Sequence, residues 1–225
     1  MSLLVYISIH GGLAIKSGLE AASFASALSS GETVAVVAGD LQGDGGLGAV
    51  GVSKVLHYSS ELVDNSQIAR LVESAVTASG ATTVLFSGNL EGGAIAPRVA
   101  VRLGAGYVPG VTELPKGDAY TRNVFSGKAT AAVSVSTEKT VLALTPNAYG
   151  VKNTDGGQSS VESFSSEVGE SKLSFGDFKP SSADGSVPLP EAERVVSAGR
   201  GLKGPENWGI VEDLARALNA KTACS

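Results

Sequence analysis

The chain has 225 residues, a net charge of −5 and a single cysteine, Cys224. This acidic balance, without any basic run, argues against nucleic acid as a partner, because phosphates are bound by clustered Lys and Arg side chains. One cysteine excludes an intrachain disulfide and a thiolate metal cluster, and it favours a reducing compartment. Since 43% of the residues are hydrophobic but only 5% are aromatic, small apolar side chains must fill the core, which suits helices lying close on a parallel sheet.

The first part of the chain alternates apolar runs with helical patterns. The run at residues 3–9 predicts a strand buried on both faces, and it is too short for a membrane span and lacks the charged lead of a signal peptide. Further strands are predicted at residues 33–38, 54–58 and 83–86, and helices at residues 19–28, ended by Gly31, and 68–75, ended by Gly80. Residues 39–52 are rich in glycine and predict a loop with at most a short helix. The alternation predicts an α/β fold, a three-layer sandwich around a mainly parallel sheet.

A glycine turn at residues 88–93 joins a strand to the predicted helix at residues 96–103. It carries Glu91 and no Lys, so it lacks the cation that a nucleotide phosphate would need. We interpret it as a tight turn.

The pattern changes to short β-runs at residues 121–125, 128–135 and 140–144. Ser126-Gly127 and residues 137–139 separate them at hairpin spacings, which predicts an antiparallel extension of the sheet. After a turn cluster at residues 147–157, the serine-rich stretch 158–184 is compatible either with edge strands at 161–168 and 172–178 or with an extended linker. Proline at positions 188 and 190 then indicates a domain boundary, with an N-terminal α/β domain at residues 1–187 and the beginning of a second domain at 188–225.

The second domain opens with a short strand around Val195 and Val196, which stops in the sequence Gly199-Arg200-Gly201. A helix is predicted to resume near Pro205, with Gly204 as its N-cap and an apolar face made of Trp208, Val211, Leu214, Ala215 and Leu218. A glycine turn between a strand and a helix brings backbone N–H groups and the positive helix end together, which favours anions. Arg200 is therefore either a ligand-binding cation or a salt-bridge partner for a neighbouring domain.

No pattern of catalytic or metal-binding residues is present. Neither His10 nor His57 has a second ligand residue at metal-binding spacing, so no metal site is predicted. No nucleophile elbow supports Ser–His–Asp catalysis, and no catalytic residue is assigned.

Three stretches, in the order of the family, resemble the electron transfer flavoprotein alpha subunit. VVSAGRGLK followed by ENW, residues 195–208, looks like the opening of the family's flavin-binding domain. APRVAVRL with VTEL, residues 96–114, is similar to a family helix and the strand after it. TRNVFSGKATAAVSVSTEKTVLALTPNAYG, residues 121–150, is similar to a family hairpin that ends in a Pro-Asn-Ala-aromatic turn.

The resemblance implies an N-terminal domain of the adenine nucleotide alpha hydrolase-like type, without a cofactor, and the first strand and helix of a second, Rossmann-like domain that binds FAD. Later flavin-domain motifs of the family, such as its Gly-Gln-Thr-Gly loop, do not occur before the chain stops at Ser225, so the chain alone is expected to bind FAD poorly. By resemblance, Gly199, Arg200, Gly201 and Ser225 would lie at the flavin, with Arg200 favouring its negatively charged reduced form.

The resemblance also implies an electron carrier rather than an enzyme. The alpha subunit would pair with a beta subunit, take electrons from dehydrogenases such as the acyl-CoA dehydrogenases of fatty acid β-oxidation, and pass them to a quinone oxidoreductase. The expected place is the bacterial cytoplasm, or the mitochondrial matrix after removal of a transit peptide, without membrane insertion. Two alternatives are an electron-bifurcating variant of the family and a stand-alone regulatory module that binds adenine nucleotides.

Overall fold

The computed structural model describes residues 2–154, 157–174, 176, 189 and 192–224. The chain divides into two compact units, residues 1–174 and residues 175–225, called here the N-terminal unit and the C-terminal unit. Each unit is described by itself.

Within the described residues, the N-terminal unit contains one sheet of nine strands in the order β11-β5-β4-β1-β6-β10-β7-β8-β9. The strands are β1 (Leu3–Ile7), β4 (Thr33–Ala38), β5 (Lys54–Tyr58), β6 (Thr83–Ser87), β7 (Gly106–Val111), β8 (Ala119–Val124), β9 (Ala129–Ser134), β10 (Thr140–Leu144) and β11 (Ser160–Ser163). Pairing is parallel from β11 to β7 and antiparallel from β7 to β9. The predicted parallel sheet with an antiparallel extension is confirmed.

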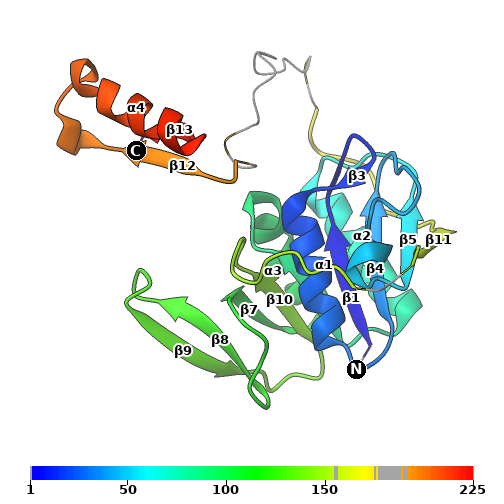
Figure 1. Cartoon of the computed structure of the whole chain (residues 1–225). Coiled ribbons are helices and arrows are strands. Elements are labelled where there is room, and N and C mark those ends of the chain that lie inside the picture. Colours follow the sequence, from blue (N-terminus) through cyan, green and yellow to red (C-terminus); the bar gives the residue numbers. More distant parts are fainter. Residues whose placement is uncertain (1, 155–156, 175, 177–188, 190–191, 225) are drawn as a thin grey trace. The chain divides into compact units, whose positions relative to one another are not determined.

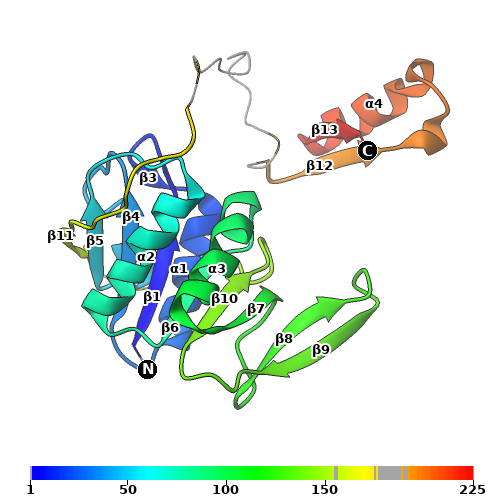
Figure 2. The same cartoon turned by 180° about the vertical axis from the view of Figure 1, so that it is seen from behind.

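Helices cover both faces of this sheet (Figures 1 and 2). Helix α1 (Lys16–Leu28) lies on one face, and α2 (Asn65–Ser79) and α3 (Leu90–Leu103) lie on the other. Because side chains alternate along a strand, Ile7 of β1 enters the core under α1 with Phe24, whereas Tyr6 enters the core under α2 and α3. The predicted three-layer sandwich is thus confirmed.

The connections after β1 and β4 follow the sequence closely. A small hairpin of β2 (Ile9–His10) and β3 (Leu13–Ala14) follows β1, so the first strand is shorter than the apolar run at residues 3–9. The glycine-rich stretch 39–52 forms a loop with one short 3₁₀ helix, η1 (Gly48–Val50), as predicted.

Two predicted helix ends have different outcomes. Gly80 is the C-cap of α2 with φ +65°, a left-handed conformation that glycine adopts without strain. Helix α1, however, ends before Gly31, because Ser29 is its C-cap in an extended conformation. The Ser29 hydroxyl then binds the Gly31 N–H at 3.1 Å, so the prediction that Gly31 ends the helix is wrong.

The predicted hairpin between the second and third β-runs is also wrong. Strand β9 pairs with β8, but β10 leaves the hairpin and inserts between β6 and β7, parallel to both. All five residues of β10 are buried, whereas β9 is largely exposed. A strand that is apolar on both faces is stabilised in the middle of a parallel sheet, and residues 137–139 therefore serve as a connection rather than a hairpin turn. The family resemblance also placed a strand at VTEL, residues 111–114. In the structure the corresponding strand, β7, ends at Val111, so that prediction is wrong for residues 112–114.

The serine-rich stretch contributes one edge strand. β11 pairs in parallel with β5 over four residues only, so the strand predicted at 161–168 is shortened and shifted. Residues 172–174 form no strand, and residues 175, 177 and 178 lie outside the described part of the chain.

Three carboxylates attach the segment 145–174 to the rest of the N-terminal unit. Glu20 on α1 accepts the backbone N–H groups of the turn at residues 147–150. Asp44 accepts the N–H of Ser159 at 2.9 Å. Asp64, the N-cap of α2, accepts the N–H of Lys172 at 3.2 Å as well as the N–H of Ser66 at 2.8 Å. A long crossover with little secondary structure is thereby held by charge-assisted hydrogen bonds.

Acid will release the last of these attachments. The hydroxyl and N–H of Ser66, with a smaller effect of the Lys172 N–H, lower the pKa of Asp64 to about 2. Because an unfolded Asp titrates near pH 3.9, Asp64 contributes stability above about pH 4 that is lost as the pH falls towards 2. Urea unfolding at pH 6, 4 and 3 should show a smaller acid loss in Asp64→Asn than in the wild type. Asp118→Asn, at an exposed turn, is the control; equal acid loss in the two variants and the wild type would contradict the prediction.

The C-terminal unit is a β-α-β arrangement (Figure 1). Its elements are β12 (Val195–Ala198), the 3₁₀ turns η3 (Arg200–Leu202) and η4 (Pro205–Asn207), α4 (Gly209–Leu218) and β13 (Lys221–Cys224). The two strands are parallel, as expected for a Rossmann-like unit. Strand β13 was not predicted, since its four residues carry no distinct apolar pattern.

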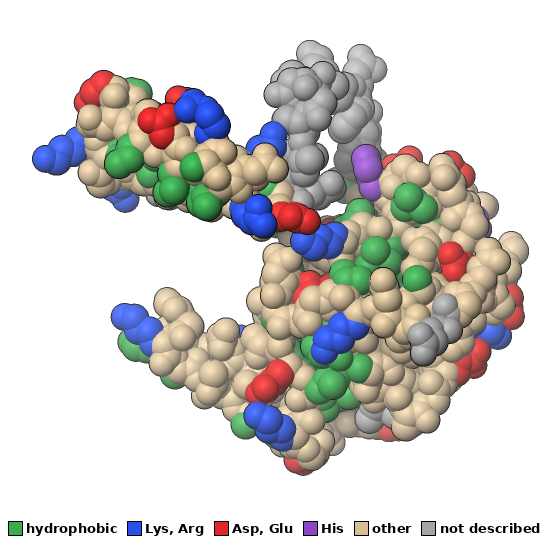
Figure 3. Space-filling view, in the orientation of Figure 1, with side chains coloured by type: hydrophobic (Ala, Val, Ile, Leu, Met, Phe, Trp, Pro, Cys, Tyr) green, Lys and Arg blue, Asp and Glu red, His purple; other side chains and the backbone are tan. Residues whose placement is uncertain are grey.

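Helix α4 differs from its prediction at its start and on its face. Gly204 and Pro205 do take the N-cap and first positions, but of the 3₁₀ turn η4, and the α-helix begins at Gly209. Val211 and Ala215 are buried, whereas Leu214 and Leu218 remain about half exposed. Two strands cover only a narrow stripe of a helix, so the predicted face is buried in part, and apolar side chains remain at the surface of this unit (Figure 3).

Candidate functional site

The candidate site lies at the carboxyl ends of the two parallel strands of the C-terminal unit. The register pairs Ala198, the last residue of β12, with Cys224, the last residue of β13. Next to them is a pocket of about 230 Å³. Its lining includes Gly199, Arg200, Lys203, Gly204, Trp208 and Cys224. In open parallel sheets, ligands bind outside the carboxyl ends of the strands, which makes this pocket the natural place for one.

Local hydrogen bonds hold the conformation of the loop that forms the pocket. The N–H of Leu202 donates to the carbonyl of Gly199 at 3.0 Å, and the Asn207 side chain donates to the carbonyl of Leu202 at 2.8 Å. Between them, Lys203 has φ +68°, which is rare for a residue with a side chain. Such conformations persist where the surroundings enforce them, and they are concentrated at ligand sites.

The pocket carries two cations. Among the described residues, neither Arg200 nor Lys203 forms a salt bridge. Arg200 is exposed, as is the thiol of Cys224. One guanidinium and one ammonium group beside glycine backbone form a site for an anionic ligand.

The predicted site residues have three different outcomes. Gly199 and Arg200 line the pocket. Gly201 is exposed beside it, and a Cβ added there would meet no atom within 4 Å, so the packing of this chain does not require glycine at that position. Ser225 lies outside the described residues.

Sequence reasoning missed several lining residues, among them Lys203, Trp208 and Cys224. Lys203 and Trp208 could have been found from their closeness in sequence to Arg200. Cys224 could not, because only the pairing of the unpredicted strand β13 brings it to the pocket.

The corresponding edge of the N-terminal unit carries the opposite charge. Glu91, in the first turn of α3, accepts hydrogen bonds from the hydroxyls of Tyr6, at 2.9 Å, and of Ser8. Burial and the carboxylate of Glu91 raise the pKa of Tyr6 well above its usual value, so Tyr6 remains a neutral donor. Asn89 caps α3 through the N–H of Gly92. A phosphate at this helix end would face a carboxylate, which argues against a phosphate site here. The tight turn predicted at residues 88–93 is wrong in its extent, because α3 begins at Leu90 and residues 90–93 form its first turn.

The described residues offer little for metal or membrane binding. They contain no group of three His, Cys, Asp or Glu side chains that could hold a metal ion. His57 is engaged with the carbonyl of Gly39 at 2.7 Å. None of the helices in the described part of the chain has the length and apolar character of a membrane span.

Comparison with known proteins agrees for both units. A family model described as the electron transfer flavoprotein domain matches residues 4–168, and one described as the electron transfer flavoprotein FAD-binding domain matches residues 188–225.

Curated relatives carry the same description. The chain is 29% identical over 203 residues to an electron transfer flavoprotein subunit alpha of Pseudomonas aeruginosa, covering 88% of this chain and 62% of that protein. It is 26% identical over 183 residues to one of Mycobacterium leprae, covering 80% and 58%. It is 28% identical over 178 residues to a probable mitochondrial one of Caenorhabditis elegans, covering 78% and 53%. The chain therefore spans a little over half the length of these relatives.

Proposed function

Because the chain belongs to the electron transfer flavoprotein alpha subunit family, we propose that its C-terminal unit supplies the first part of an FAD site in an electron-carrying heterodimer. The observation that carries this proposal is the cationic pocket at the carboxyl ends of β12 and β13, within the residues matched by the FAD-binding family model. The N-terminal unit serves as a scaffold.

The residues at the pocket fit part of a flavin nucleotide. Arg200 and Lys203 match an anionic ligand, and the open space beside Gly201 allows close approach to the backbone. The pocket, at about 230 Å³, is smaller than the roughly 300 to 1,000 Å³ of sites that enclose drug-sized molecules. An FAD molecule is larger than a drug-sized molecule, so the pocket can hold only a portion of FAD.

The residues have distinct roles in this proposal. FAD, when bound, supplies the chemistry of taking up and releasing electrons. The Arg200 guanidinium favours the form with more negative charge and so raises the reduction potential. Lys203 adds a second positive charge, and the indole of Trp208 offers an apolar wall. Gly199 and Gly201 keep side chains out of the approach. Ser225 remains a further proposed contact.

The partner subunit, the electron donors and the electron acceptor of the whole protein are proposed from the family resemblance. We propose a beta subunit as the partner, dehydrogenases such as acyl-CoA dehydrogenases as electron donors, and a quinone oxidoreductase as the acceptor. A bacterial cytoplasm or a mitochondrial matrix is the proposed location, and the relative from Caenorhabditis elegans is named as mitochondrial.

We also retain a domain boundary between residues 187 and 188 as a proposal. The first family model ends at residue 168 and the second begins at residue 188. The two compact units divide between residues 174 and 175. The start of the second family model supports the proposed boundary, whereas the compact units divide earlier in the chain.

FAD affinity should differ sharply between the heterodimer and this chain. The full-length protein co-expressed with a beta subunit should copurify as a one-to-one complex with flavin absorption bands. The 225-residue chain should bind FAD more weakly than about micromolar, because its pocket encloses too little of the cofactor. A colourless heterodimer would contradict the electron-carrier proposal, and micromolar or tighter FAD binding by the 225-residue chain would contradict the expected difference in affinity.

A further inference from the structure

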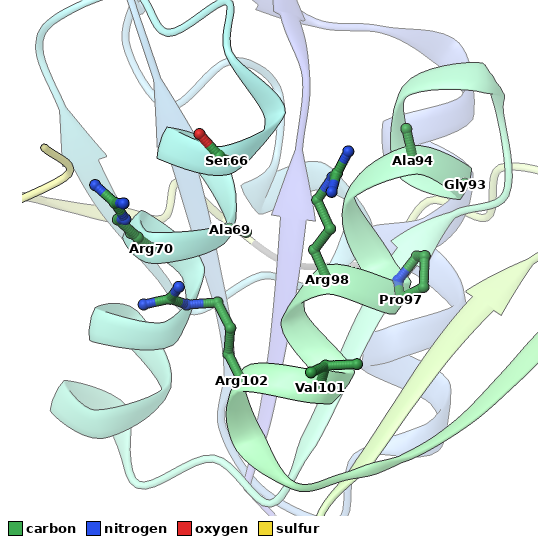
Figure 4. A pocket seen from close by; sticks show the side chains of 9 residues that line it. All are labelled: Ser66, Ala69, Arg70, Gly93, Ala94, Pro97, Arg98, Val101 and Arg102. Atoms are coloured by element: carbon green, nitrogen blue, oxygen red, sulfur yellow. The ribbon is translucent and has the colours of Figure 1, made fainter. Parts of the chain in front are cut away.

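A groove of about 620 Å³ runs between α2 and α3 on the surface of the N-terminal unit (Figure 4). Ala69 and Arg70 of α2 form one wall, and Ala94, Pro97, Arg98 and Val101 of α3 form the other. None of these residues takes part in the pocket of the C-terminal unit. The groove therefore needs an explanation of its own.

An apolar stripe runs along the outward face of α3. Leu90 is 95% exposed and Val101 is 83% exposed, although both are large aliphatic residues on a regular helix. With Ala94 and Pro97 between them, they recur at intervals of four, three and four residues, the heptad spacing by which one helix packs against another. These four residues are called here the α3 seam.

Arginine side chains flank this seam. Arg98 stands in the space between the helices (Figure 4), and it has no salt-bridge partner among the described residues. Arg102 reaches towards α2 and binds Glu73, with Nε to Oε2 at 2.6 Å. Arg70 donates to the carbonyl of Val168 at 2.9 Å. Three guanidinium groups line the groove and, in the described part of the chain, only one of them is paired with a carboxylate, so the groove is positive on a chain whose net charge is −5.

Pro97 adds a polar feature to the apolar wall. Because proline has no N–H, the carbonyl of Gly93, one turn earlier, lacks its usual helical donor. Gly93 is exposed and lines the groove. A hydrogen-bond donor of an occupant placed here would give this carbonyl a partner.

The geometry points to an interaction surface: the groove and the α3 seam bind an acidic amphipathic helix of a partner protein. Its apolar residues would pack on the seam at heptad spacing, and carboxylates at its flanking positions would pair with Arg98 and the neighbouring guanidinium groups. This inference goes beyond the proposed electron-carrier role and does not depend on it.

Shape favours a helix over a small molecule. From Leu90 to Val101 the seam extends for about 16 Å at the rise of an α-helix, which suits several turns of a second helix lying alongside. The groove runs beside the seam from Ala94 to Val101 and is open to solvent there, whereas small ligands are held in enclosing pockets. Apolar contact supplies the affinity, and the arginines supply the preference for an acidic partner.

A peptide library tests this inference on the full chain. We would display 21-residue helical peptides with leucine at heptad positions a and d and with glutamate, lysine or glutamine at positions e and g. Selection on the immobilised chain should enrich glutamate at e and g. Binding of a selected peptide, measured by fluorescence anisotropy, should weaken about tenfold or more in Arg98→Glu and in Val101→Glu. Both side chains are exposed, so these variants should fold normally.

Lys128→Glu is the matched control. Lys128 is an exposed cation on the β8–β9 hairpin, outside the groove, and its reversal changes the net charge by the same amount as Arg98→Glu. Peptide affinity should be unchanged in this variant. Failure to select any peptide, enrichment of lysine, or selected peptides that bind Arg98→Glu and Val101→Glu as tightly as the wild type would overturn the inference.

Discussion

Replacing Arg200 with alanine in the full-length heterodimer should lower the reduction potential of the bound flavin by about 30 to 60 mV. A charge-assisted contact contributes roughly 1.5 to 3 kcal/mol, and for a two-electron couple about 30 mV corresponds to 1.4 kcal/mol. The contact acts mainly on the reduced cofactor, because that form carries more negative charge. Spectroelectrochemical titration at constant ionic strength measures the shift directly.

Two variants separate charge from other effects of the substitution. Arg200→Lys keeps the charge but loses the planar fork, so its potential should fall less than that of Arg200→Ala. Arg216→Ala removes an exposed arginine of α4 that pairs with Asp213 at 2.8 Å, and it should leave the potential unchanged. If Arg200→Ala retained flavin with the wild-type potential, Arg200 would not lie at the ring.

Replacing Glu20 with alanine should destabilise the N-terminal unit by about 3 to 5 kcal/mol, the range of the most damaging single substitutions. Glu20 is only 3% exposed, and its carboxylate accepts N–H groups from Asn147 at 2.7 Å, Tyr149 at 2.9 Å and Gly150 at 2.8 Å. Alanine would leave all three donors without an acceptor. The turn also places Tyr149 edge-on against Phe24, with ring centroids 5.2 Å apart, so packing beneath α1 would loosen as well.

Urea unfolding followed by circular dichroism measures this loss. Glu20→Gln keeps one acceptor oxygen but turns an NH₂ group towards a donor N–H, so its stability should fall between those of the wild type and Glu20→Ala. Glu32→Ala, at an exposed position, should change the free energy of unfolding by less than about 0.5 kcal/mol. A loss below about 1 kcal/mol in Glu20→Ala would show that water or a rearranged turn replaces the carboxylate.

The elements of the fold were predictable because each one buries a characteristic face. β1 and β4 are apolar on both faces, and α2 shows one apolar stripe, so local periodicity was enough to identify them. The position of β10 was not predictable in this way. Its neighbours β6 and β7 are distant in sequence, and hairpin spacing after β9 suggested a nearer partner.

The candidate sites also have features that the sequence predicted and features that only the tertiary structure showed. The sequence by itself determined the α/β class, the family resemblance and the cationic glycine turn around Arg200, because these depend on residues close together in the chain. Only the tertiary structure decided that β13 brings Cys224 to that turn and that α2 and α3 leave an arginine-lined groove between them. Strand order, register and the spacing of helices arise from contacts between distant segments, and no local pattern encodes them.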